Sequence, residues 1–425
     1  MATSSARVAS AATPWRMSVN RVSPLNYKHT RTPAVQQHHK ADPSRSKSKA
    51  YFSSSSSSSP SQASQTSTSS PASPRFSYHI AASFIGKDRP YDPASHVFHF
   101  SPYNRIQPPR TRRRSSRPDS GHDAFFVSRV NDSGSVAFGL ADGVGGWVDS
   151  GVDPADFSHG FCEYMAASAY EHDSASSSPL TARQLMQKGY DAICKDRSLQ
   201  AGGSTACVGI AAPDGTFDVA NLGDSGFLQL RLNAINAYSE PQTHAFNTPF
   251  QLSLVPPSVA ARMAAFGGAQ LCDLPRDADV SQHCMRHGDI LMFATDGVLD
   301  NLFHHDILKI VSRVMASSGA WQMTPAGGVR VADCIDSLTK SPSFAGESSA
   351  AQGKMAKPIT LQSLLATDIV GAAKAASVNT KVDGPFAKEV QRYYPHEQWR
   401  GGKVDDICVV VAVVSEDVGG LRSKL

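Results

Sequence analysis

The chain has 425 residues, of which 40% are hydrophobic and 18% are charged, so it is long enough for one large domain or two ordinary ones with a sizeable core. Its longest uninterrupted apolar run, from Ile407 to Val414, has the length of a strand and argues against a membrane-spanning helix. The seven cysteines are scattered and never spaced as Cys-x-x-Cys, which argues against a disulfide framework or a zinc ribbon and predicts reduced, mostly buried thiols.

The net charge of +4 is unevenly distributed along the chain. Of the 41 Lys and Arg residues, ten lie in residues 1–75, whereas that segment holds a single one, Asp42, of the 37 acids. The basic character therefore belongs to the N-terminal tail, and the rest of the chain is weakly acidic. A nucleic-acid-binding protein usually spreads basic residues over a folded face, so we expect no nucleic-acid partner.

The first 43 residues have the composition of an organelle transit peptide. They are rich in Arg, Ala, Ser and Thr, contain no acid before Asp42 and lack the compact apolar core of a secretory signal. A merely disordered N-terminus is the alternative interpretation. Residues 44–77 include the serine run Ser53–Ser59 and are predicted to be a flexible Ser-rich linker, because they cannot bury enough apolar surface to offset the entropy of ordering.

Residues 78–416 are predicted to form one folded domain, followed by a short tail over 417–425. Short strands bounded by Gly, Asp or Asn alternate with longer helical stretches. The predicted strands are Tyr78–Phe84, Ala124–Arg129, Val136–Ala141, Thr205–Ala211, Phe217–Asn221, Phe227–Arg231, Asp289–Thr295 and Ile407–Val414, and the predicted helices are Pro154–Tyr170, Thr181–Lys195, Asp306–Ser317, Val329–Thr339 and Leu361–Ala376. Many strands are neighbours joined by short turns, which favours antiparallel sheets with helices packed outside. The stretch Ser341–Lys357 is predicted to be a surface insertion.

A cluster of arginines runs from Arg110 to Arg117 between prolines. A solvated loop is the most ordinary interpretation of such a charge run. A contact with a substrate phosphate or a partner is the alternative. Arg117 is the member nearest to the acidic residues described next, so it is the candidate for binding the substrate.

Four aspartates lie at the ends of predicted strands, each close to glycine. Asp142 and Asp296 each follow a strand and precede a glycine, Asp405 precedes the last strand, and Asp123 follows Gly121 after one residue. A strand end holds a side chain rigidly, and an adjacent glycine lets the backbone approach an ion with its carbonyl oxygen. Hard divalent cations such as Mg²⁺ and Mn²⁺ favour oxygen ligands of this kind. Taken singly, each aspartate is most simply a turn or helix cap.

Six short runs resemble, in their order along the chain, the motifs of the PPM-type (type 2C) metal-dependent Ser/Thr protein phosphatases. The runs are Gly121-His-Asp-Ala124, Leu140-Ala-Asp-Gly-Val-Gly-Gly146, Gly203-Ser-Thr-Ala206, Asn221-Leu-Gly-Asp-Ser-Gly226, Ala294-Thr-Asp-Gly-Val-Leu-Asp300 and Lys403-Val-Asp-Asp-Ile407. The similarity covers nearly all of residues 78–416. The further runs that look most like the mitochondrial branch of the family are Asp142-Gly-Val-Gly-Gly-Trp147, Phe246-Asn-Thr-Pro-Phe-Gln-Leu-Ser253, Gly384-Pro-Phe-Ala387 and Arg400-Gly-Gly-Lys403.

This resemblance implies an α+β fold, a four-layer α-β-β-α sandwich with two central antiparallel sheets flanked by helices. It implies hydrolysis of phosphoserine and phosphothreonine in phosphorylated protein substrates by a water that is activated between two divalent cations, without a covalent phosphoenzyme. The mitochondrial branch agrees with the basic tail, so residues 1–43 are predicted to be a mitochondrial transit peptide and the matrix is the expected location. The sequence indicates neither the individual substrates nor the oligomeric state.

The resemblance also assigns metal ligands, two Mn²⁺ or Mg²⁺ ions per active site. Asp142 would bridge the two ions, and the carbonyl of Gly143 would ligate one of them. Asp296 and Asp405 would complete the other ion's ligands. Asp224 could form a weaker third site together with Asp296.

Some positions depart from the family pattern. Asp123 would hold a water at the metals as a catalytic residue, but the family's usual acid before it is His122 here. Val144 stands where many relatives have a histidine, so the proton donor to the leaving group is open, with His244 as one candidate. These departures leave a second function open, a catalytically weak or dead relative that acts as a phosphoprotein-binding scaffold.

Overall fold

The computed structural model describes residues 75–100, 117–173, 178–257, 260–261, 272–340 and 359–417. All of them belong to one compact unit, Thr68–Leu425. The predicted transit peptide, the Ser341–Lys357 insertion and nearly all of the Ser-rich linker lie outside the described residues. The first strand begins at Arg75 rather than Tyr78, and the last one ends at Asp417.

A six-stranded sheet forms one half of the core, in the order β2-β1-β17-β14-β8-β9. Every pairing within it is antiparallel. Its strands are β1 (Arg75–Ile85), β2 (Val97–His99), β8 (Gly226–Arg231), β9 (Ala234–Tyr238), β14 (Ile290–Ala294) and β17 (Ile407–Asp417). The first and last strands of the domain are therefore neighbours.

A five-stranded antiparallel sheet forms the other half, in the order β13-β7-β6-β4-β3. Its strands are β3 (Asp123–Arg129), β4 (Val136–Asp142), β6 (Ala206–Ala211), β7 (Thr216–Leu222) and β13 (Asp279–Cys284). Short two-stranded pairs are added by β5 (Gly202–Ser204) with β12 (Leu252–Leu254), β10 (Thr243–Ala245) with β11 (Thr248–Pro249), and β15 (Trp321–Met323) with β16 (Val329–Val331).

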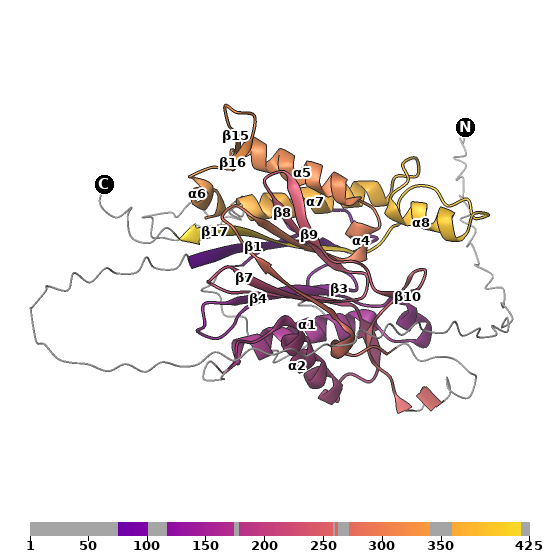
Figure 1. Cartoon of the computed structure of the whole chain (residues 1–425). Helices are drawn as coiled ribbons and strands as arrows, with labels where there is room; N and C mark the ends of the chain where they lie inside the picture. Colours follow the sequence, from indigo (N-terminus) through magenta and orange to yellow (C-terminus); the bar gives the residue numbers. More distant parts are fainter. Residues whose placement is uncertain are drawn as a thin grey trace, which may run out of the picture. The chain divides into compact units, whose positions relative to one another are not determined.

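Helices cover the outer face of each sheet (Figure 1). The five-stranded sheet is covered by α1 (Pro154–Tyr170) and α2 (Ala182–Lys195), and the six-stranded sheet by α5 (His304–Ser317) and α7 (Leu361–Ser377). The shorter elements are η2 (Gly145–Ser150), η3 (Pro275–Asp277), α4 (Asp296–Leu299), α6 (Ile335–Thr339) and α8 (Pro385–Tyr393). The predicted four-layer α-β-β-α sandwich is confirmed. No helix among the described residues has the length and apolar character needed to cross a bilayer.

The alternation of side chains in β17 shows how the layers are joined. Residues 407–414 are all fully buried. The set Ile407, Val409, Val411 and Val413 faces the helices α5 and α7, whereas Val410, Ala412 and Val414 face the other sheet. Successive residues of a strand point to opposite faces, so a central strand buried on both sides reads as a continuous apolar run.

Two sequence predictions need correction. The helix predicted over Val329–Thr339 is wrong in its first half, because Val329–Val331 pairs with Trp321–Met323 in a hairpin and only Ile335–Thr339 is helical. All seven cysteines are free, as predicted, but only three are buried; these are Cys162, Cys207 and Cys408.

Candidate active site

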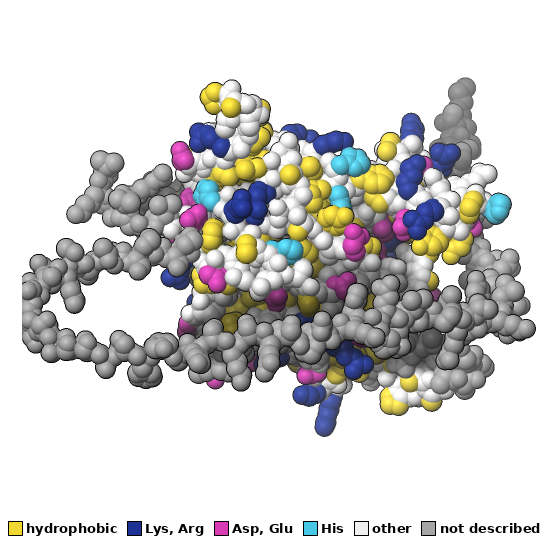
Figure 2. Space-filling model, viewed as in Figure 1, with side chains coloured by type: hydrophobic (Ala, Val, Ile, Leu, Met, Phe, Trp, Pro, Cys, Tyr) yellow, Lys and Arg dark blue, Asp and Glu magenta, His cyan; other side chains and the backbone are white. Residues whose placement is uncertain are grey.

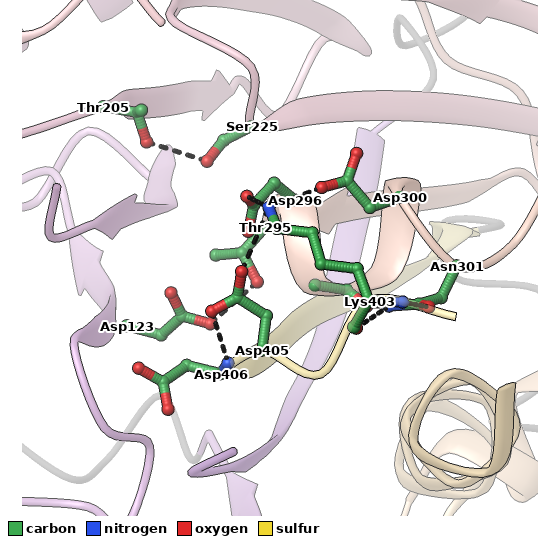
Figure 3. A network of polar contacts seen from close by, with 11 residues as sticks. Asp123, Thr205, Ser225, Thr295, Asp296, Asp300, Asn301, Lys403, Asp405 and Asp406 are labelled. Atoms are coloured by element: carbon green, nitrogen blue, oxygen red, sulfur yellow. Dashed lines mark hydrogen bonds and ion pairs between the residues drawn. The ribbon is translucent and has the colours of Figure 1, made fainter. Parts of the chain in front are cut away.

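The four predicted strand-end aspartates come together at one edge of the sandwich. Asp123, the first residue of β3, pairs with Asp142, the last residue of β4. Asp296 begins α4 and is separated from the end of β14 by Thr295 alone, and Asp405 lies just before β17, the neighbour of β14. Strand ends of both sheets therefore direct these carboxylates into one space, in which Figure 3 shows Asp123, Asp296 and Asp405.

Three of these acids, Asp142, Asp296 and Asp405, line a polar cavity of about 360 Å³. This volume falls in the range of small-molecule pockets, about 300–1,000 Å³. Asp142, Asp224, Asp296 and Asp405 line it together with the glycine-rich loop that follows β4. On the surface, acidic side chains gather beside α4, and Lys and Arg side chains lie over α8 next to them (Figure 2).

Asp123 is the deepest of these acids, with a side chain that is almost completely buried. Its Oδ2 accepts a hydrogen bond of 2.8 Å from the hydroxyl of Thr295, and its Oδ1 is buried without a hydrogen-bond partner. Burial, with the nearby charges of Asp406 and Asp296, raises the pKa of Asp123 well above its ordinary value. This carboxylate is therefore costly to ionise unless a cation or a donor joins it.

Asp142 is anchored through its backbone to the motif Gly203-Ser-Thr-Ala206. The Asp142 amide donates to the Thr205 hydroxyl at 3.2 Å, and the Thr205 amide donates to the Asp142 carbonyl at 2.9 Å. The Thr205 hydroxyl also bonds the Ser225 hydroxyl at 2.8 Å (Figure 3). Burial and the charge of Asp296 raise the pKa of Asp142 well above its ordinary value.

Lys403 contacts three carboxylates of the cluster. Its Nζ lies 2.6 Å from Asp296 Oδ2, 2.6 Å from Asp300 Oδ2 and 3.1 Å from Asp405 Oδ2. Burial, together with the charge of Asp296 and against the opposing effect of Lys403, raises the pKa of Asp300 to about 7. Burial disfavours the charged ammonium, but the three carboxylates outweigh this effect and raise the pKa of Lys403.

Asp224 lies beside this group in the turn after β7. Its Oδ1 is buried and has no hydrogen-bond partner. Burial and the charge of Asp296 raise the pKa of Asp224 well above its ordinary value. Asp224 and Asp296 are therefore close enough for their charges to interact.

Gly143 is required by close packing against the start of α1. A Cβ at this position would lie 2.9 Å from the backbone and side chain of Pro154. The Gly143 amide donates to the His122 carbonyl at 3.1 Å, which ties the loop after β4 to the loop before β3. The absence of a side chain thus lets α1 approach the loop that lines the acidic cavity.

Asp406 holds the loop that carries His122. Its carboxylate accepts hydrogen bonds from the amides of Lys87 and His122, at 2.8 and 2.9 Å. His122 Nδ1 lies 3.7 Å from Asp406 Oδ2, and the His122 carbonyl accepts a bond of 2.5 Å from Ser158. His122 lines the cavity, and so does Val144, whose apolar side chain has no proton to give.

Among the described residues, no three His, Cys, Asp or Glu side chains lie in an arrangement that could hold a metal ion as it stands. The donor set nevertheless fits hard divalent cations, because it consists of carboxylates and backbone carbonyls. Two carboxylate oxygens, Asp123 Oδ1 and Asp224 Oδ1, are buried without a donor. Uncompensated buried charges of this kind are stabilised by cations.

Comparison with known proteins gives the family. No protein-family model matches the chain. A Saccharomyces cerevisiae protein named "Protein phosphatase 2C homolog 7, mitochondrial" is 31% identical over 233 residues, which cover 54% of this chain and 67% of that protein. The protein phosphatase PTC7 homolog fig of Drosophila ananassae is 30% identical over 312 residues, which cover 73% of this chain and 78% of that protein. This chain belongs to the PTC7 branch of the PP2C (PPM-type) protein phosphatases.

The fold of this PP2C protein agrees with a solved structure. The X-ray structure of the photosystem II phosphatase PBCP matches 79% of this chain and 98% of its own length, with a TM-score of 0.50 and 20% sequence identity. At this level of identity the likeness establishes the fold. The family predicted from the six motifs is confirmed, and the protein is assigned to the protein Ser/Thr phosphatases.

Two residues considered from the sequence, Arg117 and His244, do not line the acidic cavity of this PP2C protein. Arg117 Nη2 bonds Asp156 Oδ1 at 2.5 Å, and Nη1 lies 3.8 Å from Asp153 at the start of α1. Arg117 does not line the acidic cavity, and its contact with a substrate phosphate stays a prediction. His244 bonds Asp273 at 2.9 Å and also lies outside the lining of that cavity. The remainder of the arginine cluster, residues 110–116, lies outside the described residues.

Sequence reasoning about the PP2C motifs missed the roles of Asp300, Lys403 and Thr205. Asp300 lies four residues after Asp296, a spacing that places both side chains on one face of a helical turn. That spacing could have indicated that Asp300 joins the cluster. Lys403 and Thr205 were parts of recognised motifs, but their partners lie far away in sequence.

Proposed function

We propose that this PP2C protein hydrolyses phosphoserine and phosphothreonine in proteins, using Mn²⁺ or Mg²⁺ held by its acidic cluster. The observation that carries this proposal is the convergence of Asp142, Asp296 and Asp405 from two sheets into one polar cavity, with the buried Asp123 paired across the strands with Asp142. Crowding and burial of several acids lower the stability of the folded protein unless the charges are compensated. The cluster therefore supports a role in binding cations and a phosphate.

Each residue of the cluster has a separate part in the proposal. Asp142, the Gly143 carbonyl, Asp296 and Asp405 would hold two divalent cations. When bound, such ions lower the pKa of a water molecule and neutralise phosphate oxygens. Asp123 would orient the attacking water, since its Oδ2 is fixed by Thr295 and its Oδ1 has no protein donor.

The cysteines argue against a covalent phosphocysteine mechanism. Among the described residues that line the cavity there is no cysteine. Burial raises the pKa of the Cys162, Cys207 and Cys408 thiols well above the ordinary value, so these groups are poor sources of thiolate at neutral pH. The nucleophile is therefore expected to be water.

Hydrolysis of a phosphothreonine peptide by the full chain tests this function. We expect turnover that requires added Mn²⁺ or Mg²⁺, stops in excess chelator and survives alkylation of the exposed thiols Cys194, Cys284 and Cys334. Undiminished hydrolysis in chelator would contradict the metal mechanism. A folded protein that binds Mn²⁺ and phosphopeptide without turnover would favour the scaffold function.

We propose a mitochondrial location, most simply the matrix. The support is the basic, acid-poor composition of residues 1–43 and the mitochondrial designation in the name of the yeast relative. A fusion of residues 1–77 to a fluorescent protein should therefore enter mitochondria, and the same fusion without residues 1–43 should stay in the cytosol. Cytosolic fluorescence from both fusions would contradict the transit peptide.

A further inference from the structure

The ammonium group of Lys403 lies inside the acidic cluster (Figure 3). It makes contacts of 2.6 Å to both Asp296 and Asp300 and one of 3.1 Å to Asp405, and its side chain is only 15% exposed. Two of its three N–H donors bond Asp296 and Asp300, and the ammonium forms an ion pair with Asp405. Lys403 therefore provides a fixed positive charge where the fold gathers negative ones.

The backbone of Lys403 is tied to the end of α4. Its amide donates to Asn301 Oδ1 at 2.9 Å, and its carbonyl accepts from Asn301 Nδ2 at 2.8 Å. Asn301 Nδ2 also bonds the Gly297 carbonyl at 2.9 Å, and the Lys403 ammonium lies 5.0 Å from the centre of the Phe386 ring. These contacts direct the side chain into the cluster and oppose its release to solvent.

The contacts of Lys403 leave room for metal ligation at two of its partners. It approaches one oxygen, Oδ2, of each carboxylate. A carboxylate has about four acceptor positions, so Asp296 and Asp405 can each bind Lys403 and a divalent ion together. Asp300 is different, because it has no part in the proposed two-ion site and both Asp224 and Asp296 lie close to it.

We infer that Lys403 is a built-in cation of this centre: its ammonium group takes the position between Asp296 and Asp300, on the side of Asp224, at which a further divalent ion would otherwise bind. The inference rests on the proposed function, because it assumes that two ions bind beside Lys403. According to this inference, Lys403 takes the place of the weaker third metal ion that the sequence led us to expect at Asp224 and Asp296. The Lys403 ammonium and a divalent cation are both positively charged, so the ammonium repels a dication from the position that it already fills.

Counting of bound Mn²⁺ tests the inference without any measurement of activity. Isothermal titration calorimetry of the full chain is compared with Lys403→Met, which has similar volume and no charge. We expect the variant to bind one more Mn²⁺ per chain than the unmodified protein. Lys403→Arg keeps the charge and is expected to bind the unmodified number. Equal numbers of ions in the Met variant and the unmodified protein would overturn the inference.

Asp300→Asn provides an independent test if the lysine variants fold poorly. We expect it to bind as many Mn²⁺ ions as the unmodified protein, because Asp300 binds Lys403 rather than a metal. Loss of an ion in Asp300→Asn would overturn the inference. Absence of Mn²⁺ binding to the folded, unmodified chain would contradict the proposed function itself, so the two failures are distinguishable.

Discussion

Asp142→Asn and Asp296→Asn should each lower phosphatase turnover by on the order of 1000-fold while the protein stays folded. Each change removes a ligand charge from the cluster and keeps the volume of the side chain. The ions of a phosphatase site contribute several kcal/mol of transition-state stabilisation, and about 1.4 kcal/mol corresponds to a factor of ten in rate. Loss of an ion is therefore expected to lower turnover by about 1000-fold.

In the absence of metal, Asp142→Asn should be at least as stable as the unmodified protein. Burial and the charge of Asp296 already raise the pKa of Asp142, which means that its ionised form is unfavourable in the folded state. An uncharged amide removes that repulsion. Thermal unfolding in chelator should show no decrease in the midpoint for Asp142→Asn.

Asp333→Asn is the matched control, because it makes the same chemical change on a side chain that is 84% exposed. It should keep the turnover and metal requirement of the unmodified protein. If Asp142→Asn or Asp296→Asn retained full turnover, that residue would not be a metal ligand and the assignment of its motif would be wrong.

The strand ends that carry Asp142 and Asp296 were predictable from the local sequence. Asp142 and Asp296 each follow a run of apolar residues and precede glycine, so both the strand and its end are encoded within a few neighbouring residues. The buried strand β17 was predictable for the same reason, because the eight successive apolar residues Ile407–Val414 are typical of a strand that is buried on both faces.

Other elements of the fold could not be predicted locally, because they are defined by contacts with residues far away in the sequence. The edge strand Asp279–Cys284 is largely polar and exposed, so its sequence has no strand signal, and its pairing with β7 defines it. Apolar residues at Val329, Ala332, Ile335 and Leu338 have helical spacing, which obscured the hairpin closed by Gly327. The three carboxylates around Lys403 likewise come together only after β14 and β17 pair.

Gly297→Ala should abolish turnover and destabilise the protein by about 3 kcal/mol or more, the upper part of the range for overpacking. A Cβ on Gly297 would lie 1.9 Å from the backbone carbonyl oxygen of Asp406. Backbone cannot rotate aside as a flexible side chain can, so α4 must move away from the segment before β17. That movement separates Asp296, which begins α4, from Asp405, which precedes β17.

Gly371→Ala is the control for the loss of a glycine. Its added Cβ would lie 3.5 Å from the Tyr91 ring, an ordinary contact, and alanine favours the interior of α7 by about 1 kcal/mol. We therefore expect a lower unfolding midpoint and weaker Mn²⁺ binding for Gly297→Ala alone, measured by calorimetry on the full chain. A Gly297→Ala protein with an unchanged midpoint and unchanged Mn²⁺ affinity would show that α4 and the Asp405 segment can separate without cost. In that case their close contact would not be what holds Asp296 and Asp405 at metal-binding distance.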